Sequence, residues 1–115
     1  RRVLFRSPGG CPISRRAFKK DVRYLAPGDV ATRYHDLLAL KLAEYRYTPE
    51  AAGGRPHLGF IIDDGVPEAA LRPSRDQVDL YGYTTLTVAA IQQQAREIEA
   101  LKAEVAALRA ALDKR

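Results

Sequence analysis

Residues 84–112 read TTLTVAAIQQQAREIEALKAEVAALRAAL, and the spacing of their apolar side chains decides the architecture of the chain. These side chains recur about every 3.5 residues, which is the repeat of a left-handed coiled coil. The repeat has an a set and a d set: Thr84, Ile91, Ile98, Val105 and Leu112 at a, and Thr87, Gln94, Leu101 and Leu108 at d. We therefore predict a long C-terminal helix that presents a narrow apolar seam.

Charged residues flank this seam in the way that favours self-association. Glu97 and Glu104 fall at g positions, and Lys102 and Arg109 fall at e positions. In a parallel assembly each g glutamate faces the e cation of a neighbouring chain. The alternative is a helix that packs its stripe on its own domain, but the narrow stripe and its opposite charges favour a homo-oligomer. β-Branched residues at a with Leu at d favour a dimer.

The residues before this helix predict a small α+β head. VATRYHDLLALKLA (30–43) has apolar residues at helical spacing, after a Pro27–Gly28 turn and with Asp29 as N-cap, and we expect this helix to cover a small sheet. The sheet would come from short apolar runs: a possible extended segment at 18–25, a strand at 43–49, a central strand at 57–62 and a last strand or arm at 77–83. The expected organisation is an irregular segment at 1–13, the head at 14–82 and the coiled-coil helix at 83–115.

Composition excludes several classes of protein. The 115 residues suffice for one modest domain, and 46% hydrophobic with 29% charged residues is typical of ordered chains. No apolar run approaches the roughly 20 residues of a membrane span. The single Cys11 cannot form an internal disulfide and is expected to be a bystander thiol, and with His35 and His57 it has no metal-ligand spacing. No motif indicates a cofactor.

The beginning of the chain bears on its charge. The sequence has no Met, which suggests a piece of a longer protein. Its opening stretch RVLFRS matches the translated end of a common sequencing adapter. Residues 1–7 are therefore open to a non-native interpretation. The net charge of +5 includes three arginines in this stretch, and without those three it falls to +2. We therefore do not expect a nucleic-acid partner, because the basic residues also do not run into the coiled coil as in a zipper protein.

Residues 11–25, CPISRRAFKKDVRYL, place Ser14 five residues before Lys19. A neutral lysine can accept the proton of a serine hydroxyl and so activate it as a nucleophile. Burial or nearby positive charge favours the neutral form, and four residues around the pair carry such charge: Arg15, Arg16, Lys20 and Arg23. Taken alone, Ser14 is typical of a loop or N-cap serine and Lys19 of a solvated lysine at a strand edge.

The order of segments resembles a known family. A Ser–Lys pair opens the domain, followed by LLALKLAEYRY, HLGFI, VDLYGY and VAAIQQQAREIEALKAEV. This is similar to the intramolecular chaperone auto-processing domain that ends phage tail spikes and fibres, endosialidases and related bacterial or prophage proteins. The resemblance runs from Ser14 to the C-terminus.

The resemblance implies a trimer that helps an upstream fibre- or spike-like protein to fold in the virion or on a bacterial fibre, and that then releases itself. The scissile bond would be Ile13–Ser14, with Ser14 as nucleophile and Lys19 as base, and the pair would be complete only when the trimer closes. Two features depart from the family pattern: Arg15 stands where Asp is usual, and Ile62, Asp63 and Asp64 replace Ala-Gln-Glu. A non-catalytic oligomerisation or attachment module therefore remains the alternative.

Other chemistry-bearing residues have simpler interpretations. His57 begins a strand and is expected to be structural rather than catalytic. Asp63 and Asp64 are adjacent, so they would face opposite ways on a strand, and we expect a turn rather than a cation site. Gly59, inside the same strand, is expected to allow the close approach of a ring or another backbone.

Overall fold

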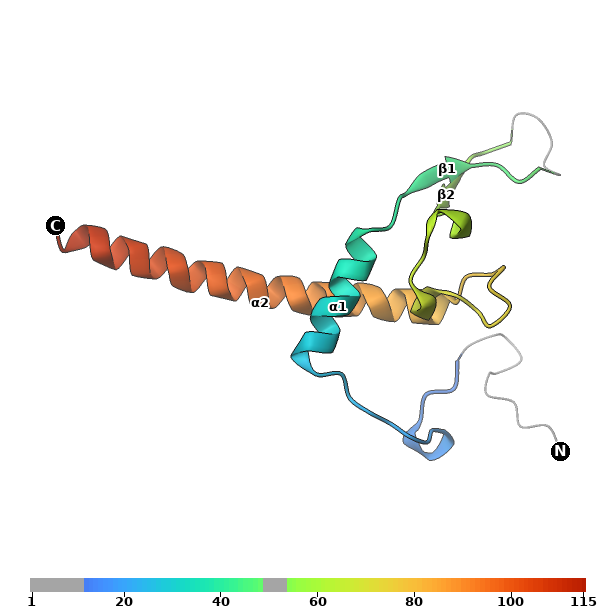
Figure 1. Cartoon of the computed structure of the whole chain (residues 1–115), viewed down its shortest axis with the longest axis horizontal. Helices are drawn as coiled ribbons and strands as arrows, with labels where there is room; N and C mark the ends of the chain where they lie inside the picture. Colours follow the sequence, from blue (N-terminus) through green and yellow to red (C-terminus); the bar gives the residue numbers. More distant parts are fainter. Residues whose placement is uncertain (1–11, 49–53) are drawn as a thin grey trace.

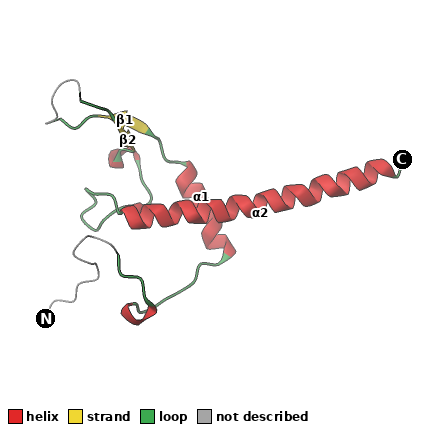
Figure 2. Ribbon diagram, turned by 180° about the vertical axis from the view of Figure 1, so that it is seen from behind, coloured by secondary structure: helices red, strands yellow, loops and turns green. Residues whose placement is uncertain are grey.

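The computed structural model describes residues 12–48 and 54–115, so Cys11, the non-native interpretation of residues 1–7 and the expected strand end at Pro49 lie outside the described residues. The fold is α+β, with a long C-terminal helix (Figures 1 and 2). Its elements in order are the 3-10 helix η1 (Arg16–Phe18), α1 (Pro27–Leu38), β1 (Ala43–Tyr45), β2 (His57–Gly59), the 3-10 helices η2 (Ile62–Asp64) and η3 (Glu68–Ala70), and α2 (Leu80–Asp113).

The first turn of α2 is fixed by a cap and by a close backbone contact. Asp79 is the N-cap, and its carboxylate accepts a hydrogen bond of 3.0 Å from the backbone N–H of Gly82. The N–H of Asp79 in turn donates to the carbonyl of Ala70, at 2.8 Å. Gly82 lies so close to η3 that a Cβ there would be 2.0 Å from the carbonyl oxygen of Ala69. The strand or arm predicted at 77–83 is therefore wrong from Leu80 onward, where the cap starts the helix, whereas Val78 before it forms an isolated antiparallel bridge with Leu71.

The core lies where α1 crosses α2 (Figure 1). Val30 of α1 is buried, and α2 contributes Leu86, Ala89 and Ala90. The two alanines let the helix backbones approach closely. The prediction that α1 covers the sheet is wrong: it packs on α2, whose small side chains offer a better apolar surface than a sheet of two short strands.

The start of α1 also differs from the prediction. Pro27 occupies the first helical position, where its missing N–H costs nothing and its fixed φ suits the helix. Asp29 is therefore not the N-cap but the third residue of the helix. Its carboxylate accepts a hydrogen bond of 3.0 Å from the backbone N–H of Ala26, which is the N-cap, and pairs with Arg23 at 2.9 Å.

The sheet is smaller than predicted. β1 and β2 pair antiparallel, with Ala43 opposite Gly59 and Tyr45 opposite His57. Within the described residues this sheet has two strands, so the segment at 57–62 is not a central strand. A Cβ on Gly59 would lie 3.1 Å from the Tyr45 ring, which confirms the predicted close approach of a ring.

Two further segments involve the short 3-10 helices η1 and η2. The run at 18–25 is not an extended strand: η1 ends at Phe18, and the residues that follow it are irregular. Asp63 and Asp64 lie in η2, which ends at Gly65 with a φ of 92°, a backbone conformation that favours glycine. The turn predicted there is confirmed.

The molecule is elongated because the distal part of α2 projects away from the other elements (Figure 2). The Cα radius of gyration is 20.4 Å, whereas a compact chain of this length would have about 13 Å. From residue 94 onward every side chain of α2 is exposed. No described part of the chain therefore buries the apolar residues of this distal part of the helix.

Substituting Gly82 tests the close contact between α2 and η3. We expect Gly82→Ala to lower the free energy of unfolding by roughly 1–3 kcal/mol, because the new Cβ meets a backbone carbonyl that cannot move alone. The matched control is Gly28→Ala in α1, where a Cβ meets nothing within 4 Å, so its stability should be unchanged or slightly raised. Urea unfolding of the variants at one chain concentration would measure both. Equal stability of Gly82→Ala and the parent would contradict the contact.

Asp29 should make stability depend on acid pH. The hydrogen bond from Arg23, and then that from the Ala26 N–H, lower the pKa of Asp29 below its ordinary value. Such a carboxylate adds stability that is present above its unfolded pKa and is lost as pH falls through the folded pKa. Asp29→Asn should therefore melt below the parent at neutral pH, and the difference should vanish in acid. Asp21→Asn is the control, since Asp21 has a φ of 54° that Asn also adopts readily.

Candidate functional site

Ser14 and Lys19 are brought together by the short helix between them. In η1, the N–H of Phe18 donates to the carbonyl of Arg15 and that of Lys19 to Arg16, at 3.1 and 3.0 Å. This turn folds the chain back on itself. The Nζ of Lys19 lies 2.6 Å from the Oγ of Ser14, within hydrogen-bond distance. The structure thus places the two predicted site residues in direct contact.

A third side chain joins this pair from the other end of the sequence. The hydroxyl of Tyr81, in the first turn of α2, lies 3.3 Å from Ser14 Oγ, and either oxygen can be the donor. Tyr81 is absent from the predicted site because residues 77–83 were predicted to form a strand or arm. The signal that could have found it is Asp79, a favoured N-cap residue. An N-cap side chain accepts a hydrogen bond from the backbone N–H three residues later, which here belongs to Gly82. That cap would have placed Tyr81 on a helix.

The charges around the pair are partly neutralised. Of the four basic residues expected to surround it, Arg23 forms an ion pair with Asp29 and Arg16 donates a hydrogen bond to the hydroxyl of Tyr24. Ser14 and Lys19 are both exposed in the single chain. The ion pair therefore compensates the charge of Arg23 alone, and no described part of the chain covers the lysine.

The contact between Ser14 and Lys19 is present within a single chain. The resemblance implied that the pair is complete only in the closed trimer, but Oγ and Nζ already meet within one chain. The physical reason is local, since only η1 separates the two residues. A neighbouring chain is not needed to bring them together.

The other candidate residues lie elsewhere. His57 begins β2 and packs against two tyrosine rings, with centroid distances of 5.7 Å to Tyr45 and 5.0 Å to Tyr47. Asp63 and Asp64 are exposed in η2. Among the residues that the structure describes, no group of three or more His, Cys, Asp or Glu side chains is placed to hold a metal ion.

The seam of α2 is the second candidate site. Its apolar residues are exposed at Ile91, Ile98, Leu101, Val105, Leu108 and Leu112, with between 45% and 65% of each accessible. The helix buries a different face against α1, because Leu86, Ala89 and Ala90 occupy the c, f and g positions of the same repeat. The seam is therefore exposed at these apolar positions and at Thr84, whereas Thr87 is half-buried.

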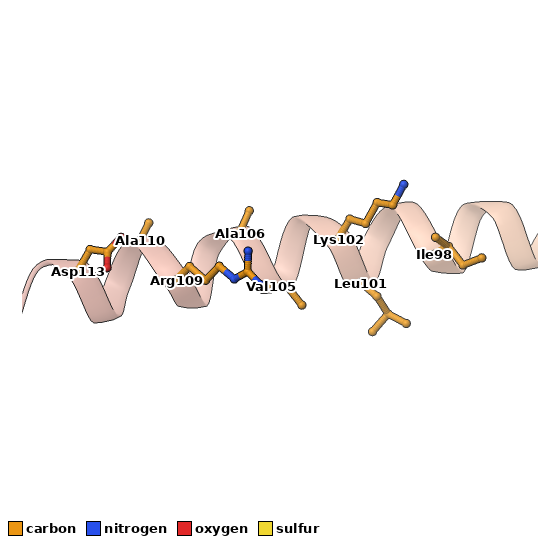
Figure 3. A pocket seen from close by; sticks show the side chains of 8 residues that line it. All are labelled: Ile98, Leu101, Lys102, Val105, Ala106, Arg109, Ala110 and Asp113. Atoms are coloured by element: carbon orange, nitrogen blue, oxygen red, sulfur yellow. The ribbon is translucent and has the colours of Figure 1, made fainter.

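Side chains along the distal part of α2 enclose a shallow hollow, lined by Ile98, Leu101, Val105 and the stems of Lys102 and Arg109 among others (Figure 3). A hollow on an isolated helix has one wall, so it resembles half of a helix–helix interface more than a ligand site. Lys102 pairs with Glu99 of its own chain at 3.2 Å. Such an exposed pair is weak and would not prevent Lys102 from facing a glutamate of another chain.

Neither helix within residues 12–48 and 54–115 has an apolar stretch long enough to span a bilayer. The chain matches no family model, and neither characterised proteins nor solved structures show significant similarity to it. The functional interpretation therefore depends on two arrangements in the chain itself: the Ser14–Lys19 contact with its tyrosine, and the open seam of α2.

Proposed function

We propose that the chain is a C-terminal intramolecular chaperone that self-associates through α2, aligns the upstream parts of its precursor, and releases itself by cleaving the Ile13–Ser14 bond. The observation that carries the proposal is the 2.6 Å contact between Lys19 Nζ and Ser14 Oγ. The pair lies at the predicted boundary between the upstream segment and the head, and the heptad seam of the same chain is exposed. The family resemblance supports a trimer and a fibre- or spike-like precursor.

The pair can support an acyl shift followed by hydrolysis. Neutral Lys19 accepts the proton of Ser14 Oγ, and Oγ attacks the carbonyl carbon of Ile13. Lys19 then returns the proton to the amide nitrogen of Ser14 as the C–N bond breaks, which leaves an ester between Ile13 and Ser14 Oγ. Water hydrolyses this ester. The products are a carboxylate at Ile13 and a chain that begins with the free amino group of Ser14.

Assembly would supply what the single chain lacks around Lys19. A lysine base must be neutral, and removal from water favours the neutral form. Both members of the pair are exposed in the single chain, so neighbouring copies that cover them would promote the reaction. In this proposal assembly controls cleavage through the burial of the pair and not through its geometry.

The seam provides the driving force for assembly. Burying an exposed aliphatic side chain stabilises a complex by about 1.5–3 kcal/mol, and the seam offers six such side chains per chain. The threonines near its start do not oppose association, because Thr84 and Thr87 hydroxyls already bond to carbonyls of their own helix. Parallel α2 helices would bring the upstream segments of all copies to the same end, since Ser14 contacts the base of α2.

A plain oligomerisation module is the second candidate. The exposure of Ser14 and Lys19 favours it, because removal from water is what promotes the neutral lysine that the reaction needs. Such a module would use the same seam and perform no chemistry.

Self-cleavage predicts a change in mass that depends on two side chains. The parent chain, made in cell-free translation behind an initiator methionine, should lose the residues before Ser14. Ser14→Ala and Lys19→Met should stay intact, because each removes one partner of the proton transfer.

Lys20→Met is the matched control. It removes the adjacent lysine and leaves the Ser14–Lys19 pair, so it should be cleaved like the parent. Intact-mass spectrometry under denaturing conditions separates the outcomes. A parent that stays whole would rule out cleavage in this chain and favour the oligomerisation module.

The seam predicts the mass of the assembly. Ile98→Asp places a charge at an a position and should convert the oligomer to single chains, whereas Ala103→Asp places it on the outer face and should leave the oligomer intact. Both residues are exposed in the single chain, so neither change disturbs its core. Sedimentation equilibrium measures the mass independently of shape. A parent that sediments as a monomer would refute self-association.

A further inference from the structure

We propose that Tyr81 is a positioning residue that holds the Ser14 hydroxyl for its attack on the preceding carbonyl. This inference rests on the proposed self-cleavage. The phenol oxygen of Tyr81 lies 3.3 Å from Ser14 Oγ, and Lys19 Nζ lies 2.6 Å from the same oxygen. In the described residues these are the two side chains hydrogen-bonded to the nucleophile.

Tyr81 is presented by one of the best-anchored parts of the molecule. Its neighbours in the helix are fixed by the Asp79 cap and by the contact of Gly82 with Ala69. Its own carbonyl accepts a hydrogen bond from the hydroxyl of Thr85 at 2.9 Å. Ser14, by contrast, lies in an irregular segment just before η1. A hydroxyl fixed on a helix can restrict where a loop hydroxyl points, and such restriction places a reacting atom.

A donor on this side of Ser14 can fix the direction of its attack. The hydroxyl oxygen has two lone pairs, so a hydrogen bond from the Tyr81 phenol occupies one of them and leaves the other for the carbonyl carbon of Ile13. By restricting the orientation of Oγ, this bond raises the fraction of chains in which the attacking atom is correctly placed. Tyr81 keeps its own proton throughout.

The same contact connects the reaction to the self-associating helix. Tyr81 belongs to α2, whose seam begins within its next turn at Thr84. Any displacement of the base of α2 would therefore move the donor away from Ser14. Cleavage would then depend on correct placement of this helix, even though η1 alone brings Ser14 and Lys19 together.

The test compares two tyrosines of the same helix turn by removing only their hydroxyl groups. Tyr81→Phe loses the hydrogen bond to Ser14. Tyr83→Phe is the matched control: the Tyr83 ring packs on Phe60 with a centroid distance of 5.2 Å, and Phe keeps this packing. Full-length chains are made by cell-free translation, and the intact mass is followed with time. We expect Tyr81→Phe to cleave roughly tenfold more slowly but to the same end point, and Tyr83→Phe to match the parent.

The split between rate and end point distinguishes positioning from a structural role. A hydroxyl that positions Ser14 changes the rate of cleavage and leaves its end point unchanged, whereas a hydroxyl that only stabilises the fold lowers the fraction of chains that can be cleaved. Circular dichroism would check that helix content is equal in all three chains.

Each remaining outcome overturns the inference. If Tyr81→Phe cleaves at the parent's rate, Tyr81 does not position Ser14, and the proposed function is unaffected. If only the end point falls, the hydroxyl serves folding alone. If the parent is not cleaved at all, both the proposed self-cleavage and the role of Tyr81 are wrong.

Discussion

The first turn of α2 is the contact on which the other parts of this fold depend. Asp79 caps the helix, its N–H binds the carbonyl of Ala70, and Gly82 lets the helix backbone lie against Ala69. These contacts hold η3 and set the direction in which α2 leaves the head. They also place Tyr81 beside Ser14. The position of Tyr81 in the candidate site is thus set by the start of α2 and not by a hydrophobic core around the site.

The faces of α2 are divided between two tasks. Near its base one face buries Leu86, Ala89 and Ala90 against α1, while the a and d positions stay accessible. From residue 94 onward every side chain of the helix is exposed with respect to the described part of the chain. Because α1 occupies the side away from the seam, the head can pack on its helix without covering the surface proposed for assembly. A single helix can in this way stabilise its own head and offer an interface to other copies.

The sequence predicted the long helix correctly because a repeat specifies it. The predictions failed where a few local contacts determine how an element begins or what it packs against. The heptad pattern predicted the long helix, and the five-residue spacing suggested that Ser14 and Lys19 act together, because both signals lie within one segment. The predicted start of α2 was wrong because the residue types of Leu80, Tyr81 and Tyr83 favour a strand, whereas the cap at Asp79 starts a helix. The place of α1 could not be read from its own stripe, since an apolar stripe does not specify which surface it covers.

The elongated shape has a hydrodynamic consequence. A radius of gyration of 20.4 Å is that of a compact globular protein of roughly 350 residues, about three times the length of this chain. A single copy will therefore tumble more slowly than a globular protein of its mass and leave a sizing column earlier. The projecting helix makes one chain resemble, to such a column, a compact protein of greater mass.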